Sequence, residues 1–166
     1  MRRVRIVLVA ALAASATSVV LVANGSGQTT GARTLTFFEP TTGSTFQFVD
    51  LPPKSTKTNP LSIGDEVIFS NPILNGRGGA RVGTAHAEGT FVQGHSPSNG
   101  LILGRGVFKL RNGELVVQGL FRSSDKAHTD TVAVIGGTGA YEGARGQFTS
   151  RTNADGSSQD TVQLLP

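Results

Sequence analysis

The chain has 166 residues, no cysteine, 22 glycines and 16% charged residues, and its formal net charge is +4. Without cysteine it forms no disulfide or zinc–thiolate site, and its three histidines are not clustered in the sequence. This length is typical of a single domain. The composition therefore predicts one folded unit that is stabilised by its core alone and contains no metal.

The N-terminus combines a basic start with a long apolar run. Arg2, Arg3 and Arg5 precede a segment without charge from Ile6 to Ala23. This pattern is typical of an export signal. We therefore expect residues 1–23 to be a signal peptide, cleaved at a point between residues 16 and 25, and the mature protein to be secreted. An uncleaved membrane anchor is the alternative that the pattern leaves open.

Removal of this segment changes the charge balance. It carries three arginines and no acid, so 15 basic residues become 12 against 11 acids and the net charge falls from +4 to +1. No basic run with interleaved aromatic residues occurs in the remainder. We therefore expect no nucleic-acid binding and no stable membrane insertion after cleavage.

Residues 24–32 are polar and predict a flexible lead-in to a single domain over residues 33–166. In this domain, short runs rich in β-branched and aromatic residues alternate with turn signals, and no window has a helical period. The runs are 35–39, 45–50, 66–74, 81–93, 101–111, 114–121, 131–136, 144–152 and 160–165. The turn signals are Asn75-Gly76, Asn99-Gly100, Asn112-Gly113 and Asp155-Gly156.

The segment Gly106 to Phe121 is the clearest hairpin, and apolar residues occur on both of its faces. This is expected where one face of a sheet lines a lumen and the other meets a second subunit. Glycines within the runs suit the bends of a small barrel. The pattern predicts an all-β protein with an antiparallel barrel of about eight strands that self-associates. A β-sandwich is the alternative.

The segment VAVIGGTGAYEGARGQFTS (residues 132–150) allows two interpretations. A strand followed by clustered glycines suggests a dinucleotide-binding loop. However, counting G-x-G-x-x-G from Gly137 puts Glu142 at the last position, and the residues that follow lack helical spacing. The segment therefore predicts two antiparallel strands joined by a glycine-rich turn.

Three strings together resemble the allene oxide cyclase and dirigent barrel superfamily. They are IGDEVIFSNPI (63–73), ELVVQGLF (114–121) and VIGGTGAYEGARGQF (134–148). The resemblance implies an eight-stranded antiparallel barrel with an apolar lumen, commonly a trimer, and no cofactor. Allene oxide cyclases close an unstable fatty-acid epoxide, whereas dirigent proteins orient phenoxy radicals that an oxidase supplies.

The resemblance also implies site residues. Glu39 matches the region of a lumen glutamate in allene oxide cyclases, and Asn71 matches an asparagine that helps to hold a lumen water. An inward carboxylate in an apolar barrel is costly unless it is used or paired. We therefore expect Glu39 and Asn71 to be catalytic, with a solvent-facing Glu39 and a turn-capping Asn71 as the alternatives. The expected ligand-binding residues are Phe37, Phe91, Phe108 and Phe121.

Other polar residues could contribute to the chemistry. His86 and Glu88 share one face of a predicted strand and could form a proton-transfer couple, although an exposed polar face is the simpler explanation. Surface or ladder positions are the simpler interpretation for the remaining candidates. These are Asp65, Glu88, Asp130 and Arg145.

Two features depart from the plant cyclases. The chain lacks their cysteine, and Gly43-Ser44-Thr45 stands where their pattern reads Gly-Ser-Pro. The sequence therefore predicts a secreted barrel that binds a small apolar or phenolic reactive intermediate and steers its cyclisation or stereoselective coupling. Its activity would be that of an isomerase or cyclase, or of a dirigent-type auxiliary to an oxidase. The alternative is a non-catalytic secreted module that binds a ligand or another protein.

Overall fold

The computed structural model describes residues 32–166 except 59 and 97. The expected signal peptide and most of the lead-in lie outside the described residues. In the described part of the chain, no helix combines the length and hydrophobicity that a membrane crossing requires. Residues 32–166, with the two gaps just named, form one 3₁₀ turn, η1 (Gly139–Tyr141), and nine strands. The strands are β1 (Arg33–Glu39), β2 (Thr45–Val49), β3 (Glu66–Leu74), β4 (Arg81–Ser96), β5 (Asn99–Leu110), β6 (Gly113–Ser124), β7 (Thr129–Gly137), β8 (Gly146–Thr152) and β9 (Ser158–Leu164).

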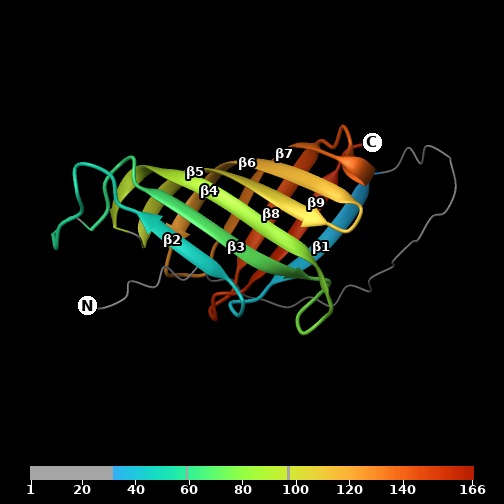
Figure 1. Cartoon of the computed structure of the whole chain (residues 1–166), viewed down its shortest axis with the longest axis horizontal. Coiled ribbons are helices and arrows are strands. Elements are labelled where there is room, and N and C mark those ends of the chain that lie inside the picture. Colours follow the sequence, from blue (N-terminus) through green and yellow to red (C-terminus); the bar gives the residue numbers. More distant parts are fainter. Residues whose placement is uncertain (1–31, 59, 97) are drawn as a thin grey trace, which may run out of the picture.

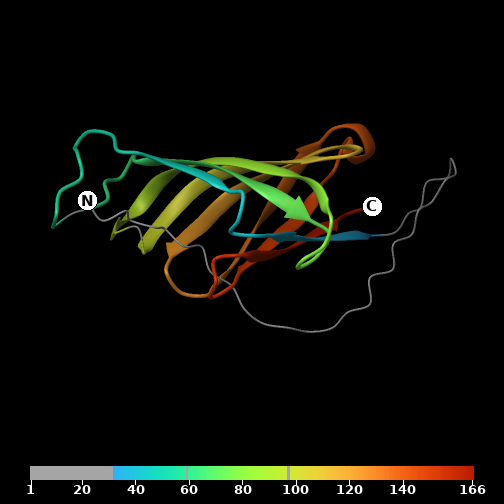
Figure 2. The same ribbon diagram turned by 60° about the horizontal axis from the view of Figure 1, so that its bottom comes forward.

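The strands form one antiparallel sheet that closes on itself. Its order is β1-β9-β8-β7-β6-β5-β4-β3-β2, and β1 also pairs with β3. Because β1 and β2 both run along β3, they act as two halves of one interrupted strand. The ring therefore has eight positions, and the predicted eight-stranded barrel is confirmed. Figures 1 and 2 show β2 to β6 on one side of this barrel, with β8, β9 and β1 on the other.

The turn chemistry explains the hairpins. Asn112-Gly113 connects β5 to β6, and Gly113 has a φ of +146°. A Cβ there would lie 2.0 Å from the carbonyl oxygen of Thr138, so only glycine fits. Asn99-Gly100 differs from the prediction, because it begins β5 instead of forming the turn. Gly100 is required there for packing, because a Cβ would lie 2.8 Å from the ring of Phe91.

The glycine-rich segment forms the predicted hairpin. β7 pairs with β8 in an antiparallel register, and η1 lies in the connection between them. Gly139 has a φ of +59°, a left-handed conformation that glycine adopts without strain. Tyr141 is buried against the main core. The segment is therefore a packed connection, and the rejection of the dinucleotide-binding loop is confirmed.

Side chains that alternate along the strands fill the barrel interior in two clusters. The main cluster occupies the part of the barrel formed by β1, β7, β8 and β9 together with facing residues of β3 to β6. It includes Phe37, Ile73, Phe108, Leu115 and Phe148. The second cluster contains Leu61, Val67, Phe91 and Ile102. Phe121 packs against both clusters and so connects them.

Candidate functional site

A polar group lies at the seam where the barrel closes. Glu39 is the last residue of β1, Asn71 belongs to β3 and Asp160 belongs to β9. Strand alternation directs all three inward: Phe37 and Glu39 share a face, and Asp160 lies directly opposite Phe37. Asn71 is in phase with Ile73, which is fully buried. The polar group therefore borders the apolar interior.

A direct hydrogen bond joins Glu39 and Asn71. The Asn71 Nδ2 atom donates a 2.6 Å hydrogen bond to Glu39 Oε2. Glu39 is buried, which is unusual for a carboxyl group unless it is partnered or protonated. The structure therefore brings together the two residues that the sequence singles out as catalytic. It places Glu39 in the interior, not in solvent.

Asp160 is the third member, and the sequence analysis missed it. It is fully buried, and Ser158 Oγ donates to its Oδ2 atom at 3.3 Å. Its Oδ1 atom has no hydrogen-bond partner among the described residues. A proton on Glu39 would supply the missing donor. Asp160 is in phase with the buried Val162 and Leu164, and this alternation is the signal that could have revealed it.

The electrostatics agree with a shared proton. Burial raises the pKa of Glu39 well above its ordinary value, and the negative charge of Asp160 raises it further. The hydrogen bond from Asn71 acts in the opposite direction. Burial also raises the pKa of Asp160, against hydrogen bonds from Glu39, Ser150 and Ser158. Both directions are those expected when two buried carboxyl groups share one proton, with Glu39 as the hydrogen-bond donor and Asp160 as the acceptor.

An acid pair of this kind has defined chemical abilities. The Glu39 proton can be given to an oxygen that gains negative charge, while Asp160 stabilises the group that supplies it. Asn71 fixes the orientation of the Glu39 carboxyl through Oε2. The pair can also take a proton from a hydroxyl group of a ligand. The apolar surroundings strengthen each of these interactions.

Aromatic side chains border the polar group. The rings of Phe37 and Phe108 are stacked with centroids 6.2 Å apart, and those of Phe108 and Phe148 are 5.0 Å apart. Of the four phenylalanines expected to bind ligand, Phe37 and Phe108 are in the main cluster. Phe91 is fully buried in the second cluster, and Phe121 lies between the two. The structure therefore does not bring all four together around Glu39.

The inner face remains accessible at β2. Phe46 lies directly opposite Phe69, which is in phase with the inward Asn71 and Ile73. Nevertheless 48% of Phe46 is exposed, and Phe69 is only half-buried. Solvent therefore reaches inward-facing aromatic residues at this strand, two positions along β3 from Asn71. A ligand could approach the acid pair by the same route.

The other candidate residues lie elsewhere. Asp65 is fully buried and accepts hydrogen bonds from the backbone N–H groups of Leu51 and Ser62, so it holds the β2–β3 loop. Its surface or ladder interpretation is wrong, because these bonds offset the cost of its burial. Arg145 is exposed.

Asp130 also departs from the surface interpretation. It is buried, its Oδ1 atom lies 3.2 Å from Arg122 Nε, and its Oδ2 atom lies 3.2 Å from His128 Nε2. The hydrogen bond to Asp130 raises the pKa of His128. The charged guanidinium of Arg122 and the imidazole of His128 therefore offset the cost of burying Asp130.

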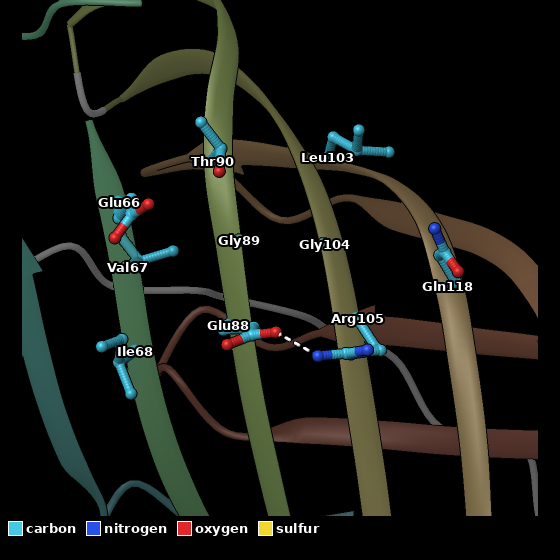
Figure 3. A pocket seen from close by; sticks show the side chains of 10 residues that line it. All are labelled: Glu66, Val67, Ile68, Glu88, Gly89, Thr90, Leu103, Gly104, Arg105 and Gln118. Atoms are coloured by element: carbon cyan, nitrogen blue, oxygen red, sulfur yellow. Dashed lines mark hydrogen bonds and ion pairs between the residues drawn. The ribbon is translucent and has the colours of Figure 1, made fainter. Parts of the chain in front are cut away.

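His86 and Glu88 do not form a couple. His86 Nδ1 is 2.8 Å from Ser70 Oγ, whereas Glu88 forms an exposed ion pair with Arg105 at 2.6 Å. Figure 3 shows this pair among the residues that line a groove on the outer face of β3 to β6. The groove has a volume of about 330 Å³. Strand alternation places the groove outside the barrel. It is therefore separate from the acid pair.

The chain was compared with known proteins. Residues 33–165 match the family model described as "Dirigent-like protein". No curated protein matches the chain significantly. Among solved structures, a pyocyanin demethylase is 21% identical with a TM-score of 0.61, and the match covers 81% of this chain and 100% of that one.

Two further structures have similar folds. The pterocarpan synthase dirigent protein PsPTS1 is 19% identical with a TM-score of 0.56, and the match covers 81% of this chain and 93% of that one. AbnU, an exo-specific intermolecular Diels-Alderase, is 13% identical with a TM-score of 0.58, and the match covers 81% and 98%. These likenesses concern the fold. Because the family model spans nearly all of the described barrel, this chain belongs to the dirigent-like protein family.

Proposed function

We propose that this barrel binds a small apolar or phenolic reactive intermediate in its lumen and steers its cyclisation or stereoselective coupling. The observation that carries the proposal is the buried contact of Glu39 with Asn71 and Asp160 beside an aromatic wall. A shared proton held in an apolar interior is costly to the fold. A role in orienting or protonating a ligand accounts for this arrangement.

The physical basis of steering is orientation. An intermediate that reacts without help still has several accessible conformations, and a protein selects the product by holding one of them. The Phe37 and Phe108 rings would hold an apolar or aromatic body by stacking. The acid pair would hold one polar atom of the ligand and give or take one proton there.

The acid pair narrows the ligand class. A group that can donate or accept a hydrogen bond is needed at one end of the ligand, and an apolar body is needed at the other. A phenol or an enol meets both needs, and an epoxide meets the acceptor need alone. The names of the neighbours, a dirigent pterocarpan synthase and a Diels-Alderase, support a barrel in which small reactive molecules are guided.

The proposal has a catalytic and an auxiliary form. In the catalytic form, the Glu39 proton assists ring closure as in an isomerase or cyclase. In the auxiliary form, a separate oxidase supplies radicals and the barrel sets the stereochemistry of their coupling. Secretion through the N-terminal signal is part of the proposal, since it would place the barrel outside the cell.

A binding module without turnover is the second candidate. It is favoured by one observation: Phe37, Phe108 and Phe148 contact one another and occupy the interior next to the acid pair. If these rings do not move, a ligand would reach only the accessible part of the inner face near Phe46. Such a protein would bind apolar molecules without changing them.

The experiment compares product stereochemistry with and without the protein. Unsaturated fatty-acid epoxides and oxidase-generated phenoxy radicals serve as substrates, and the enantiomeric ratio of each product is measured. Enrichment of one product enantiomer from either substrate class supports steering by the barrel and identifies the class on which it acts. Racemic products throughout the panel, together with saturable binding of a fluorescent apolar dye, would reject steering and leave the binding module.

A further inference from the structure

The seam that carries the acid pair is held by few backbone contacts. In the described residues, β1 and β3 share one paired position, Phe38 with Leu74. The hydrogen bond from Asn71 to Glu39 crosses the same seam on the inside. Any relative movement of β1 and β3 would therefore separate Asn71 from Glu39.

An arginine spans this seam on the outside. Phe38 points away from the lumen, because it alternates with the inward Phe37 and Glu39. The guanidinium of Arg77, in the β3–β4 turn, lies 4.7 Å from the centroid of the Phe38 ring. Contact with this guanidinium helps to explain why an outward phenylalanine is almost fully buried.

The guanidinium of Arg77 also contacts the β8–β9 turn. Arg77 Nη1 donates to Asp155 Oδ2 at 2.9 Å, and Nη2 donates to Ser157 Oγ at 3.2 Å. One side chain thus connects β3, β1 and the residues that lead into β9. These are the three strands that supply Asn71, Glu39 and Asp160.

Hydrogen bonds within the β8–β9 turn connect the Arg77 contact to the residues that lead to Asp160. Ser157 donates to Asp155 Oδ1 through its hydroxyl at 2.6 Å and through its backbone N–H at 3.0 Å. These two bonds, and then Arg77, hold the pKa of Asp155 below its ordinary value, so the carboxylate stays charged. Ser157 precedes Ser158, which donates to Asp160.

We propose that Arg77 is a positioning residue that clamps β1 between β3 and β9 from outside and so keeps Glu39 in contact with Asn71 and Asp160. The geometry of this clamp stands without the proposed function. Only the statement that the polar group takes part in a reaction rests on that function. An exposed ion pair alone contributes little, and the side chains of Arg77 and Asp155 are 60% and 53% exposed. The planar guanidinium adds stacking on Phe38 and a second donor to Ser157, which lysine cannot reproduce.

The test measures the titration of the Glu39 and Asp160 carboxyl carbons by NMR in the ligand-free protein. Arg77→Gln should loosen the seam and admit water, so the pKa of Glu39 should fall by about half a pH unit, or about threefold in proton affinity. Arg77→Lys should behave in the same way, because it keeps the charge and loses the planar group. A wild-type titration in Arg77→Lys would show that charge alone acts and would overturn the clamp.

The matched control is Arg105→Gln. Arg105 also forms an exposed ion pair, with both side chains 60% exposed, on the outer face of the barrel. The Arg105→Gln variant should leave the Glu39 titration unchanged. An equal shift of the Glu39 pKa in Arg77→Gln and Arg105→Gln would overturn the clamp. If Arg77→Gln fails to fold, Phe38→Leu removes the ring beneath the guanidinium while keeping the ion pair with Asp155, and it should lower the pKa of Glu39 in the same direction.

An unchanged Glu39 titration in folded Arg77 variants would also overturn the clamp. Because this titration uses no ligand, that result would leave the proposed function standing. Conversely, racemic products from the wild-type protein would reject the function without altering the titration. The two failures are therefore distinguishable.

Discussion

Asn71 on β3 donates a 2.6 Å hydrogen bond to Glu39 on β1, across the line where the barrel closes. The bond joins residues that are 32 positions apart in the sequence. It therefore links the closure of the fold to the geometry of the acid pair. A change in this bond should affect both stability and titration.

Replacement of Asn71 by leucine should remove the donor while keeping a similar volume. Glu39 Oε2 would then be buried without its partner, and the free energy of unfolding should fall by about 1–3 kcal/mol. Chemical denaturation of Asn71→Leu, Glu39→Leu and the double variant gives the coupling between the two residues, because leucine at either position removes the hydrogen bond. Strictly additive effects would show that the bond contributes no stability.

The pH dependence of stability should reveal the raised pKa of Glu39. A carboxyl whose folded pKa lies above its unfolded value of about 4.3 stabilises the fold fully below that pH and loses this contribution as the pH rises. Between about pH 4 and neutrality, the wild-type protein should therefore lose stability relative to Glu39→Gln, by at most about 1.4 kcal/mol per pH unit. Asp160 acts in the same direction.

The measurement is urea unfolding of both proteins at several pH values across this range. The difference between the two curves isolates Glu39 from the groups that titrate in both proteins, such as His128. Parallel curves would show that Glu39 ionises normally in the folded state.

The outer face of the barrel predicts self-association. Ile68, Leu103 and Leu120 are exposed there, and Leu103 lies directly opposite Leu120 on the neighbouring strand. Adjacent exposed leucines are uncommon on a monomeric surface. Figure 3 shows Glu88 and Arg105, which carry opposite charges, on the same outer face as Leu103. The family resemblance suggests three copies.

Sedimentation of the wild-type protein should give a trimer, and Leu103→Lys with Leu120→Lys should shift it towards monomer. Leu165→Lys, at another exposed apolar residue near the C-terminus, is the control and should leave the trimer intact. A wild-type protein that stays monomeric at every concentration would contradict the prediction.

The N-terminal segment should be absent from mature extracellular protein. The basic start and the uncharged run from Ile6 to Ala23 support removal of residues 1–23. Mass spectrometry of secreted material should find an N-terminus between residues 16 and 25. Recovery of the intact segment in a membrane fraction would instead indicate an anchor.

Local sequence signals predicted the fold well. Each run of β-branched and aromatic residues became a strand, and Asn112-Gly113 forms a hairpin turn because glycine alone fits the crowded position beside Thr138. For Glu39, the sequence left an inward and a solvent-facing orientation open, and the structure shows the inward one. These inferences depend on neighbours in the chain, which the sequence displays directly.

Asp160 could not be paired with Glu39 from the sequence. Its phase with Val162 indicates an inward side chain, but the residue that it meets depends on how β9 is staggered against β1. That stagger is set by the closure of the whole ring. The interruption between β1 and β2 was predicted by the separate runs 35–39 and 45–50, but the pairing of both strands with β3 depends on closure and has no signal in either run alone.

The stereochemistry of the product formed with Glu39→Gln tests the role of the buried acid pair most directly. Glutamine keeps the shape and can still accept from Asn71 and donate to Asp160, but it has no proton to transfer. With the substrate class that the wild-type protein resolves, the enantiomeric ratio or the rate should fall sharply in Glu39→Gln, while dye binding and folding persist. Glu88→Gln, at the exposed ion pair with Arg105, should match the wild type. An unchanged ratio and rate in folded Glu39→Gln would contradict the central claim that the buried acid pair acts on the ligand.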